Sequence, residues 1–295
     1  MSILHDTTIT PLYICLKSTD YTTLNNQYNS YITFELYRPI SIESNVDMWL
    51  QVESFKFTNS IYNVNIYNNI FYYGLAGSGY SITSSTIGRG NYDITTLIAA
   101  LNTIGDGFSF AYDNTSFKIT ITNSQDFKLY PNSFNILKVI GFSNAIQTSL
   151  SNTIQSDQMI NLIGPQMLYV SIPNISVNSY SIKNSNSNNK SVVSSVPISA
   201  IQGDTQIYSS TIRHSINDKV ITHLQVRIAD EDDNEVNFNG VPWFINLSFI
   251  FSYKKQYLKP TYLSDLAGNS PSESSTAQAD GNLESEPQPS DGNVS

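Results

Sequence analysis

The side chains most able to do chemistry are few and lie far apart in the sequence. The histidines are His5, His214 and His223, and no G-x-S-x-G elbow is present to expose a nucleophilic serine. His214 and His223 lack the cysteine pair or the H-x₃₋₅-H spacing of a zinc site. We therefore predict no catalytic, cofactor-binding or metal-binding residues, no cofactor and no enzymatic activity.

The single cysteine, Cys15, also indicates a structural position. It alternates with Tyr13 and Lys17, opposite Leu12, Ile14 and Leu16, which predicts a half-buried strand residue with no base to activate its thiol. A single cysteine also excludes an internal disulfide, which argues against an ordinary secreted scaffold.

Three further motifs are weighed for ligand binding. The acidic run Asp230–Glu235 could gather carboxylates around Ca²⁺, but its spacing is not that of an EF-hand, and a solvated hairpin loop is the alternative. The stretch Gly74–Tyr80 lacks the lysine of a P-loop and is predicted as a flexible loop. Tyr253–Tyr262 interleaves lysines with tyrosines and could contact nucleic acid, although solvated lysines are the simpler interpretation.

Alternation of apolar and polar residues predicts several strands. Asp47–Phe57 places Met48, Leu50 and Val52 on one face, and a slip near Ser54 predicts a bulge before Phe55 and Phe57. Trp243–Tyr253 has the strongest alternation and is predicted as a central core strand. Further strands are predicted at Tyr31–Tyr37, at Leu168–Ile172 and at Lys219–Ala229, where Val220, Leu224, Val226 and Ile228 would share a face.

The middle of the chain reads as a small α+β unit. Asp93 is a good N-cap for a helix that Gly105 would end, and residues 105–122 alternate as a hairpin. A second short helix is predicted at Ser133–Ile140. Asn178–Ser191 is of low complexity and predicted as a mobile loop, and Ser264–Ser295 has the composition of a disordered tail.

The composition favours packing over catalysis. Hydrophobic residues make up 40% of the 295 residues and charged residues only 13%, about half the usual share. Six acids and no Lys or Arg lie in 264–295, so the remaining chain is near neutral in spite of the net charge of −9, and general nucleic-acid binding is not indicated. We find neither a signal-peptide pattern nor an apolar run long enough to span a membrane.

Four segments together resemble a known family. They are GRGNYDITTLIAALN (88–102), FSFAYDNTSFKITI (108–121), NSFNILKVIGF (132–142) and HLQVRIADEDDNEVNFNGVPWFINLSFIF (223–251). In this order they resemble the penton and minor capsid proteins of virophages, Polinton-like viruses and related large DNA viruses, over about half of the chain. The last block looks like the closing hairpin of those proteins. Its acidic loop carries more charge than this family leads us to expect, and the tail is not a hallmark of it.

The resemblance implies a mostly β fold, an antiparallel β-sandwich (jelly roll) with a small α+β insertion and a disordered acidic C-terminal tail. The sandwich would comprise residues 1–60 and 165–258, the insertion 61–164 and the tail 259–295. The implied function is a structural virion protein, the penton subunit at the fivefold vertex of an icosahedral capsid, assembled inside the host cell. Its partners would be itself, as a homopentamer, and a major capsid protein, with no small-molecule substrate. The alternative is another minor capsid protein or a receptor- or glycan-binding fibre head.

Overall fold

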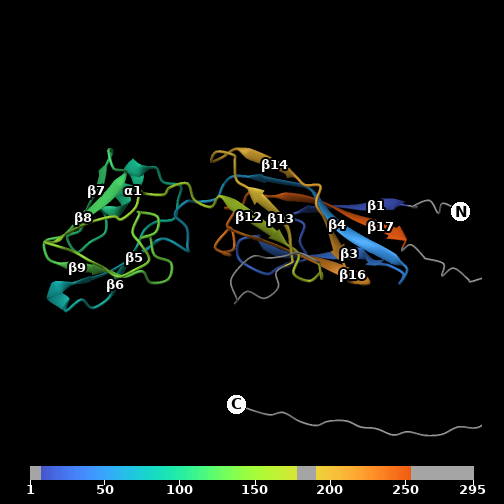
Figure 1. The fold of residues 1–295 in the computed structure, drawn as a ribbon, viewed down its shortest axis with the longest axis horizontal. Helices are drawn as coiled ribbons and strands as arrows, with labels where there is room; N and C mark the ends of the chain where they lie inside the picture. Colours follow the sequence, from blue (N-terminus) through green and yellow to red (C-terminus); the bar gives the residue numbers. More distant parts are fainter. Residues whose placement is uncertain (1–7, 178–190, 254–295) are drawn as a thin grey trace, which may run out of the picture. The chain divides into compact units, whose positions relative to one another are not determined.

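The computed structural model describes residues 8–177 and 191–253, and Figure 1 shows their course. Every described residue belongs to one compact unit within Met1–Lys254. The predicted tail at 259–295, the lysines of Tyr253–Tyr262 and the predicted mobile loop, except its last residue Ser191, lie outside the described residues.

Two antiparallel sheets form a sandwich from the first and last parts of this unit. The first sheet has the order β1 (Thr8–Lys17), β17 (Phe244–Tyr253), β4 (Val46–Thr58) and β14 (Thr205–Ser209), with β15 (Arg213–Ile216) also paired to β4. The second has the order β13 (Val192–Pro197), β12 (Met167–Ser171), β16 (Val220–Ala229), β3 (Tyr31–Ser41) and β2 (Thr23–Leu24).

The strand order is that of a jelly roll. With β14 and β15 taken as one position and the two-residue β2 set aside, eight strands remain. In chain order, the first, eighth, third and sixth strands form one sheet, and the fifth, fourth, seventh and second form the other. Strands that follow one another in sequence therefore often lie in opposite sheets, as two Greek keys require. The predicted mostly β jelly-roll fold is confirmed.

The inner faces of both sheets make one apolar core. Leu224, Val226 and Ile228 of β16 and Ile245 and Leu247 of β17 are fully buried in it. Each large side chain of this kind stabilises the fold by roughly 1.5–3 kcal/mol through burial alone. The position of β17 between β1 and β4 confirms that Trp243–Tyr253 holds a central core strand.

A bulge in β4 keeps its apolar side chains on the inner face. Val52 pairs with Leu247, but Ser54 pairs with Asn246, so Glu53 is the extra residue. Val52 and Phe55 are consequently both fully buried although they are three residues apart. The predicted slip near Ser54 is confirmed.

In β16 the prediction that Val220 shares the inner face with Leu224 is wrong. The pairing with β3 shifts between Ile221 and His223, where several residues of β3 bulge out. Because of this irregularity Ile221 is buried and Val220 is exposed. Strict alternation along the sequence cannot reveal a bulge in the partner strand.

The connection from β16 to β17 is also not the predicted hairpin. The two strands belong to different sheets, so residues 230–243 cross the end of the sandwich. Val236, Phe238 and Trp243 are buried along this crossing, and the Trp243 indole N–H donates to Asn29 O at 2.8 Å. The inner faces of β16 and β17 therefore pack toward each other across the core. Two strands paired side by side in one sheet could not do this.

Residues between β4 and β12 gather around a second apolar core (Figure 1). Leu97, Phe71, Phe127 and Ile136 are among its fully buried members. Two small sheets surround it, with orders β10-β9-β5-β6 and β11-β8-β7. The strands of these sheets are β5 (Ile70–Leu75), β6 (Thr83–Thr86), β7 (Ser109–Asp113), β8 (Lys118–Thr122), β9 (Phe127–Leu129), β10 (Gln147–Thr148) and β11 (Thr153–Gln155). The same region also contains the 3₁₀ helix η1 (Ala76–Ser78) and the α-helix α1 (Ile94–Leu101).

The helix α1 begins as predicted but ends earlier. The Asp93 carboxylate accepts from Thr96 N at 2.8 Å, and Thr96 Oγ1 accepts from Asp93 N, which completes a capping box. The helix stops at Leu101 rather than near Gly105. The cause is Asn102, whose side chain binds both the N–H and the carbonyl of Phe110 and so fastens the helix end to β7.

The predicted helix at Ser133–Ile140 is wrong, because this segment forms turns. Ile136 N donates to Ile70 O, and Ile70 N donates to Phe134 O, so β5 takes up the backbone groups that a helix would need. Phe134 itself has a positive φ of 64°. Ile136 and Ile140 are nevertheless fully buried, because their spacing suits one tight turn as well as a helix.

A buried amide ties the two ends of the insertion together. Asn63 is 4% exposed, and its Nδ2 donates to Leu162 O at 2.9 Å and to Tyr92 O at 2.8 Å. Its Oδ1 accepts from Tyr92 N at 2.9 Å. One side chain therefore joins the chain entering the insertion, the segment before α1 and the chain leaving the insertion.

Candidate functional site

The structure does not bring the two described histidines together. His214 lies on β15 of the first sheet, where Nε2 contacts Val193 O at 2.9 Å. His223 lies on β16 of the second sheet, where Nδ1 contacts Thr222 Oγ1 at 3.0 Å. His5 lies outside the described residues. Each of these two imidazole rings thus has a hydrogen-bond partner close by, and the two rings lie in different sheets.

Cys15 is exposed, and the prediction of a half-buried position is wrong. Its strand β1 is an edge strand, and β17 is its one partner among the described strands. An outward side chain on an edge strand has a neighbour on one side only, so little covers it.

The glycine-rich stretch Gly74–Tyr80 is an ordered turn and not the predicted flexible loop. Tyr80 N donates to Leu75 O at 2.9 Å, and Gly79 adopts a left-handed φ of 63°. A Cβ on Gly74 would lie 2.6 Å from Tyr80 O, so the close return of the chain requires glycine there. These glycines shape a turn at the end of β5.

The carboxylates of the acidic run Asp230–Glu235 point to separate partners on the protein. Asp232 pairs with Lys138 Nζ at 2.9 Å, and Glu231 accepts from Gln166 N at 3.3 Å. Among residues 8–177 and 191–253, no three His, Cys, Asp or Glu side chains are grouped to hold a metal ion. These carboxylates bind other groups of the protein and do not converge on one point.

Arg227 organises the far end of this run. Its Nη1 lies 2.8 Å from Asp233 Oδ1, and its Nη2 donates to Asp233 O at 3.0 Å. Glu235 lies 4.0 Å from the Arg227 Nε and accepts from Asn26 Nδ2 at 2.8 Å. A half-buried guanidinium with two carboxylates fixes the crossing between the sheets.

Asp230 caps the turn at the start of the run. Its Oδ1 accepts from Asp232 N at 2.9 Å and from Asn234 N at 2.8 Å. Burial raises the pKa of the Asp230 carboxyl, and the hydrogen bonds from Asn234 oppose this rise. The site therefore favours the protonated acid more than water does.

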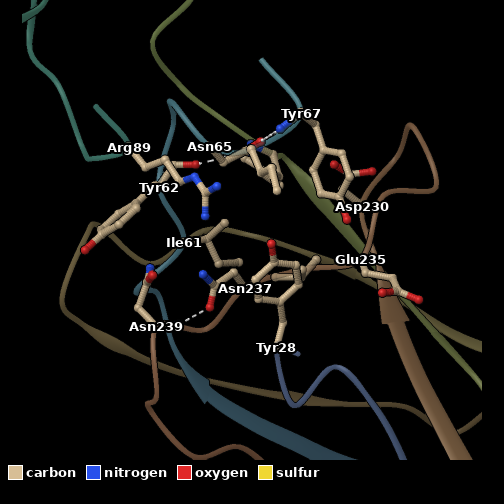
Figure 2. Close-up of a pocket in the computed structure, with 13 residues that line it drawn as sticks. Tyr28, Ile61, Tyr62, Asn65, Tyr67, Arg89, Asp230, Glu235, Asn237 and Asn239 are labelled. Carbon is tan, nitrogen blue, oxygen red and sulfur yellow. Dashed lines mark hydrogen bonds between the residues drawn. The ribbon is translucent and has the colours of Figure 1, made fainter. Parts of the chain in front are cut away.

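A small cavity lies beside this turn (Figure 2). Its volume is about 20 Å³, room for about one water molecule. Tyr67, Asp230 and Glu235 lie along one side of it in Figure 2, and Arg89 and Tyr62 lie along another. Burial and the nearby carboxylate of Glu235 raise the pKa of the Tyr67 phenol. The cavity is too small for an organic ligand.

A much larger groove of about 580 Å³ shares one wall with that cavity. Its floor and sides come from three segments of the insertion and from the acidic run. Polar side chains dominate, and Phe134 and Tyr67 are its exposed or half-buried aromatic residues. The lining residues used below are Asn63, Asn65, Asn68, Asn132, Ser133, Asn135, Lys138, Asn144, Asn161, Asp230, Glu231 and Asp232.

Sequence reasoning missed this groove, and the signal for it is diffuse. The segment Pro131–Asn135 places asparagines around an exposed Phe134. Phe134 falls within the predicted helix at Ser133–Ile140, so the sequence pattern does not single it out. No short motif links it to residues 63–68 or 161–165. Only the fold brings these segments to one place.

Similarity to known proteins is found at the level of structure. No protein-family model matches the sequence, and no curated protein matches it. Among solved structures, the mavirus penton protein is similar with a TM-score of 0.43 and 12% sequence identity. The alignment covers 83% of this chain and 100% of that protein's chain.

Proposed function

We propose that this chain is a structural protein of an icosahedral viral capsid, and that it forms the fivefold vertex as a homopentamer bound to a major capsid protein. The resemblance of its sequence segments to penton and minor capsid proteins supports this, and so does the jelly-roll fold, which viral capsid proteins share with lectins. A fold alone does not decide between these classes, so the surface has to be considered.

The observation that carries the proposal is a pair of unlike apolar edges on the sandwich. On the edge formed by β1 and β2, the exposed residues include Leu12, Tyr13 and Leu24. On the edge formed by β14, they include Ile207 and its neighbours in the flanking connections, Ile201 and Ile212.

Two different patches on one subunit are what a closed ring needs, because each subunit offers one patch to the next. Among the described strands, β1 and β14 lie at the two ends of their sheet, and a strand at a sheet edge offers backbone groups that a neighbouring chain can cover. The low share of charged residues, 13%, reduces the desolvation cost of burying such surfaces. A stable contact of this kind would bury about 1,000 Å² or more.

The proposal is tested by charging one edge. Ile207→Asp should convert the assembly into single chains, because an aspartate at the centre of the β14 edge must be desolvated without a partner. Light scattering after size-exclusion chromatography measures the mass. Leu150→Asp is the control, since Leu150 is also highly exposed, at 83% against 66% for Ile207, lies in a different part of the molecule and should leave the assembly intact. Equal masses for Ile207→Asp and wild type would contradict the role of this edge.

The alternative of a fibre head that binds a receptor or glycan is favoured by one specific observation, the polar groove of the insertion. A trimer in solution would favour it over the vertex.

A further inference from the structure

The groove has the size of a ligand site. Its volume of about 580 Å³ falls within the range of roughly 300–1,000 Å³ that small-molecule sites occupy. It is lined from residues 63–68, 131–144, 161–165 and 230–234, so it is built from parts of the chain that are distant in sequence.

An exposed aromatic side chain, Phe134, lies in the groove. Phe134 is 48% exposed, and its backbone has a φ of 64°, a left-handed conformation that a bulky residue rarely adopts. Its ring packs against Tyr67, with centroids 6.0 Å apart and planes tilted by 52°. The surrounding turn thus holds an apolar ring in solvent at a backbone cost.

Amide side chains surround Phe134 in two roles. Asn65, Asn68 and Asn135 hydrogen-bond to nearby backbone groups and hold the loops in shape. Asn132, Ser133 and Asn144 make no side-chain hydrogen bond within the described part of the chain. An asparagine side chain both donates and accepts, so this second set offers neutral partners of both kinds to a ligand.

The charges around the groove select against anions. Asp230, Glu231 and Asp232 line it, and the lysine on its wall, Lys138, is already paired with Asp232 at 2.9 Å. Phosphate, sulfate or carboxylate groups would therefore meet an excess of negative charge. A simple cation would find these carboxylates already engaged by backbone and lysine donors.

We propose that this groove binds a neutral oligosaccharide. A sugar ring presents an apolar C–H face, which matches the exposed ring of Phe134, and a rim of hydroxyls, which match amide groups that donate and accept. In this assignment Phe134 and Tyr67 stack against one sugar ring, and Asn132, Ser133 and Asn144 bind the hydroxyls. The site is independent of the capsid role, since none of these residues lies on the two apolar edges.

The test uses the full chain and saturation-transfer NMR. The probes are maltotriose, mannotriose, galactotriose and triacetylchitotriose, with sialyllactose as the anionic comparison. We expect saturation transfer to the ring protons of at least one neutral trisaccharide, and weaker transfer to sialyllactose. Phe134→Asn should weaken the affinity for that trisaccharide by about tenfold or more, as loss of an aromatic stacking surface does.

The chain offers a closely matched control. Phe117 is 50% exposed and has a φ of 57°, but it lies in the β7–β8 hairpin outside the groove. Asn tolerates this backbone conformation, so Phe117→Asn and Phe134→Asn should both fold, and Phe117→Asn should change affinity by less than about twofold. The proposal is overturned if no neutral trisaccharide receives saturation, if sialyllactose binds more tightly, or if both variants lose affinity equally. It is also overturned if Phe134→Asn binds as the wild type does.

Discussion

The sandwich and the insertion bury their apolar residues by different means. The sandwich relies on long strands, with β3, β4, β16 and β17 each 10 to 13 residues long. The insertion has strands of two to six residues and a single eight-residue helix among its described elements. Of the nine non-glycine residues with positive φ in the described part of the chain, six lie in it, namely Tyr80, Asp106, Phe117, Phe134, Ser151 and Asn152.

This difference shows how short elements can be held in place. Long strands fix one another through ladder hydrogen bonds and a continuous apolar face. Short elements depend on side chains that bind the backbone, such as Asn63 at the neck of the insertion and Asn102 at the end of α1. Changes in the insertion should therefore act through single polar side chains more often than changes in the sandwich.

The largest expected effects come from truncating one large buried side chain in each core. Trp243→Ala should destabilise the sandwich by about 3–5 kcal/mol, and Leu97→Ala should destabilise the insertion by about 2–5 kcal/mol. Trp243 makes edge contacts with Phe34 and Phe55, and Leu97 is fully buried in the second core. Urea unfolding followed by circular dichroism measures both changes.

Native-state hydrogen exchange on these two variants tests whether the proposed boundaries at 61 and 164 separate independent parts. If they do, Leu97→Ala should speed exchange across 61–164 and leave the amides of β4 and β17 protected. Equal acceleration in both regions would show one cooperative unit and refute the division.

The next largest effect concerns the buried amide at the neck. Asn63→Ala removes three hydrogen bonds and leaves the backbone groups of Tyr92 and Leu162 without partners. We expect a loss of about 3 kcal/mol in unfolding free energy. The control is Asn161→Ala, because Asn161 is exposed and accepts one bond from Ile163 N, so its loss should cost less than about 1 kcal/mol. Similar losses for both variants would contradict a special role of Asn63.

The smallest effect concerns the cap of α1 and its pH dependence. Hydrogen bonds from Thr96 lower the pKa of the Asp93 carboxyl below its ordinary value of 3.8. A lowered pKa in the folded chain means that this stabilisation is present above pH 3.8 and is lost as the pH falls through the lowered value. Asp93→Asn keeps a capping side chain but cannot titrate, so its stability relative to the wild type should rise between pH 5 and about pH 2.5. Parallel pH profiles from urea unfolding would contradict this.

The two regions also differ in how far the sequence predicts them. The inner faces of β4 and β17 follow from alternation, and even the bulge at Glu53 is visible as a slip in the pattern. The exposure of Val220 is not predictable, because the irregularity lies in the partner strand β3. The same holds for the crossing at 230–243, since sequence proximity of two strong strands suggests a hairpin unless their sheets are known.

In the insertion, a local signal predicts structure only where it is self-contained. The N-cap Asp93 needs nothing from elsewhere and is correctly predicted, and the structure adds Thr96 as the second half of a capping box. Residues 133–140 have helical spacing, but Ile70 captures their backbone groups and turns result. The groove forms where residues 63–68, 131–144, 161–165 and 230–234 meet in the fold. Its Asn-rich lining could therefore not be predicted from the sequence alone.

The most direct test of the proposed function is the mass of the full chain in solution, measured by light scattering after size-exclusion chromatography. A homopentamer, five times the 32.9 kDa chain mass, is the predicted result. A trimer would contradict the vertex role and favour a fibre head, and a single chain at all concentrations would contradict self-assembly through the two apolar edges.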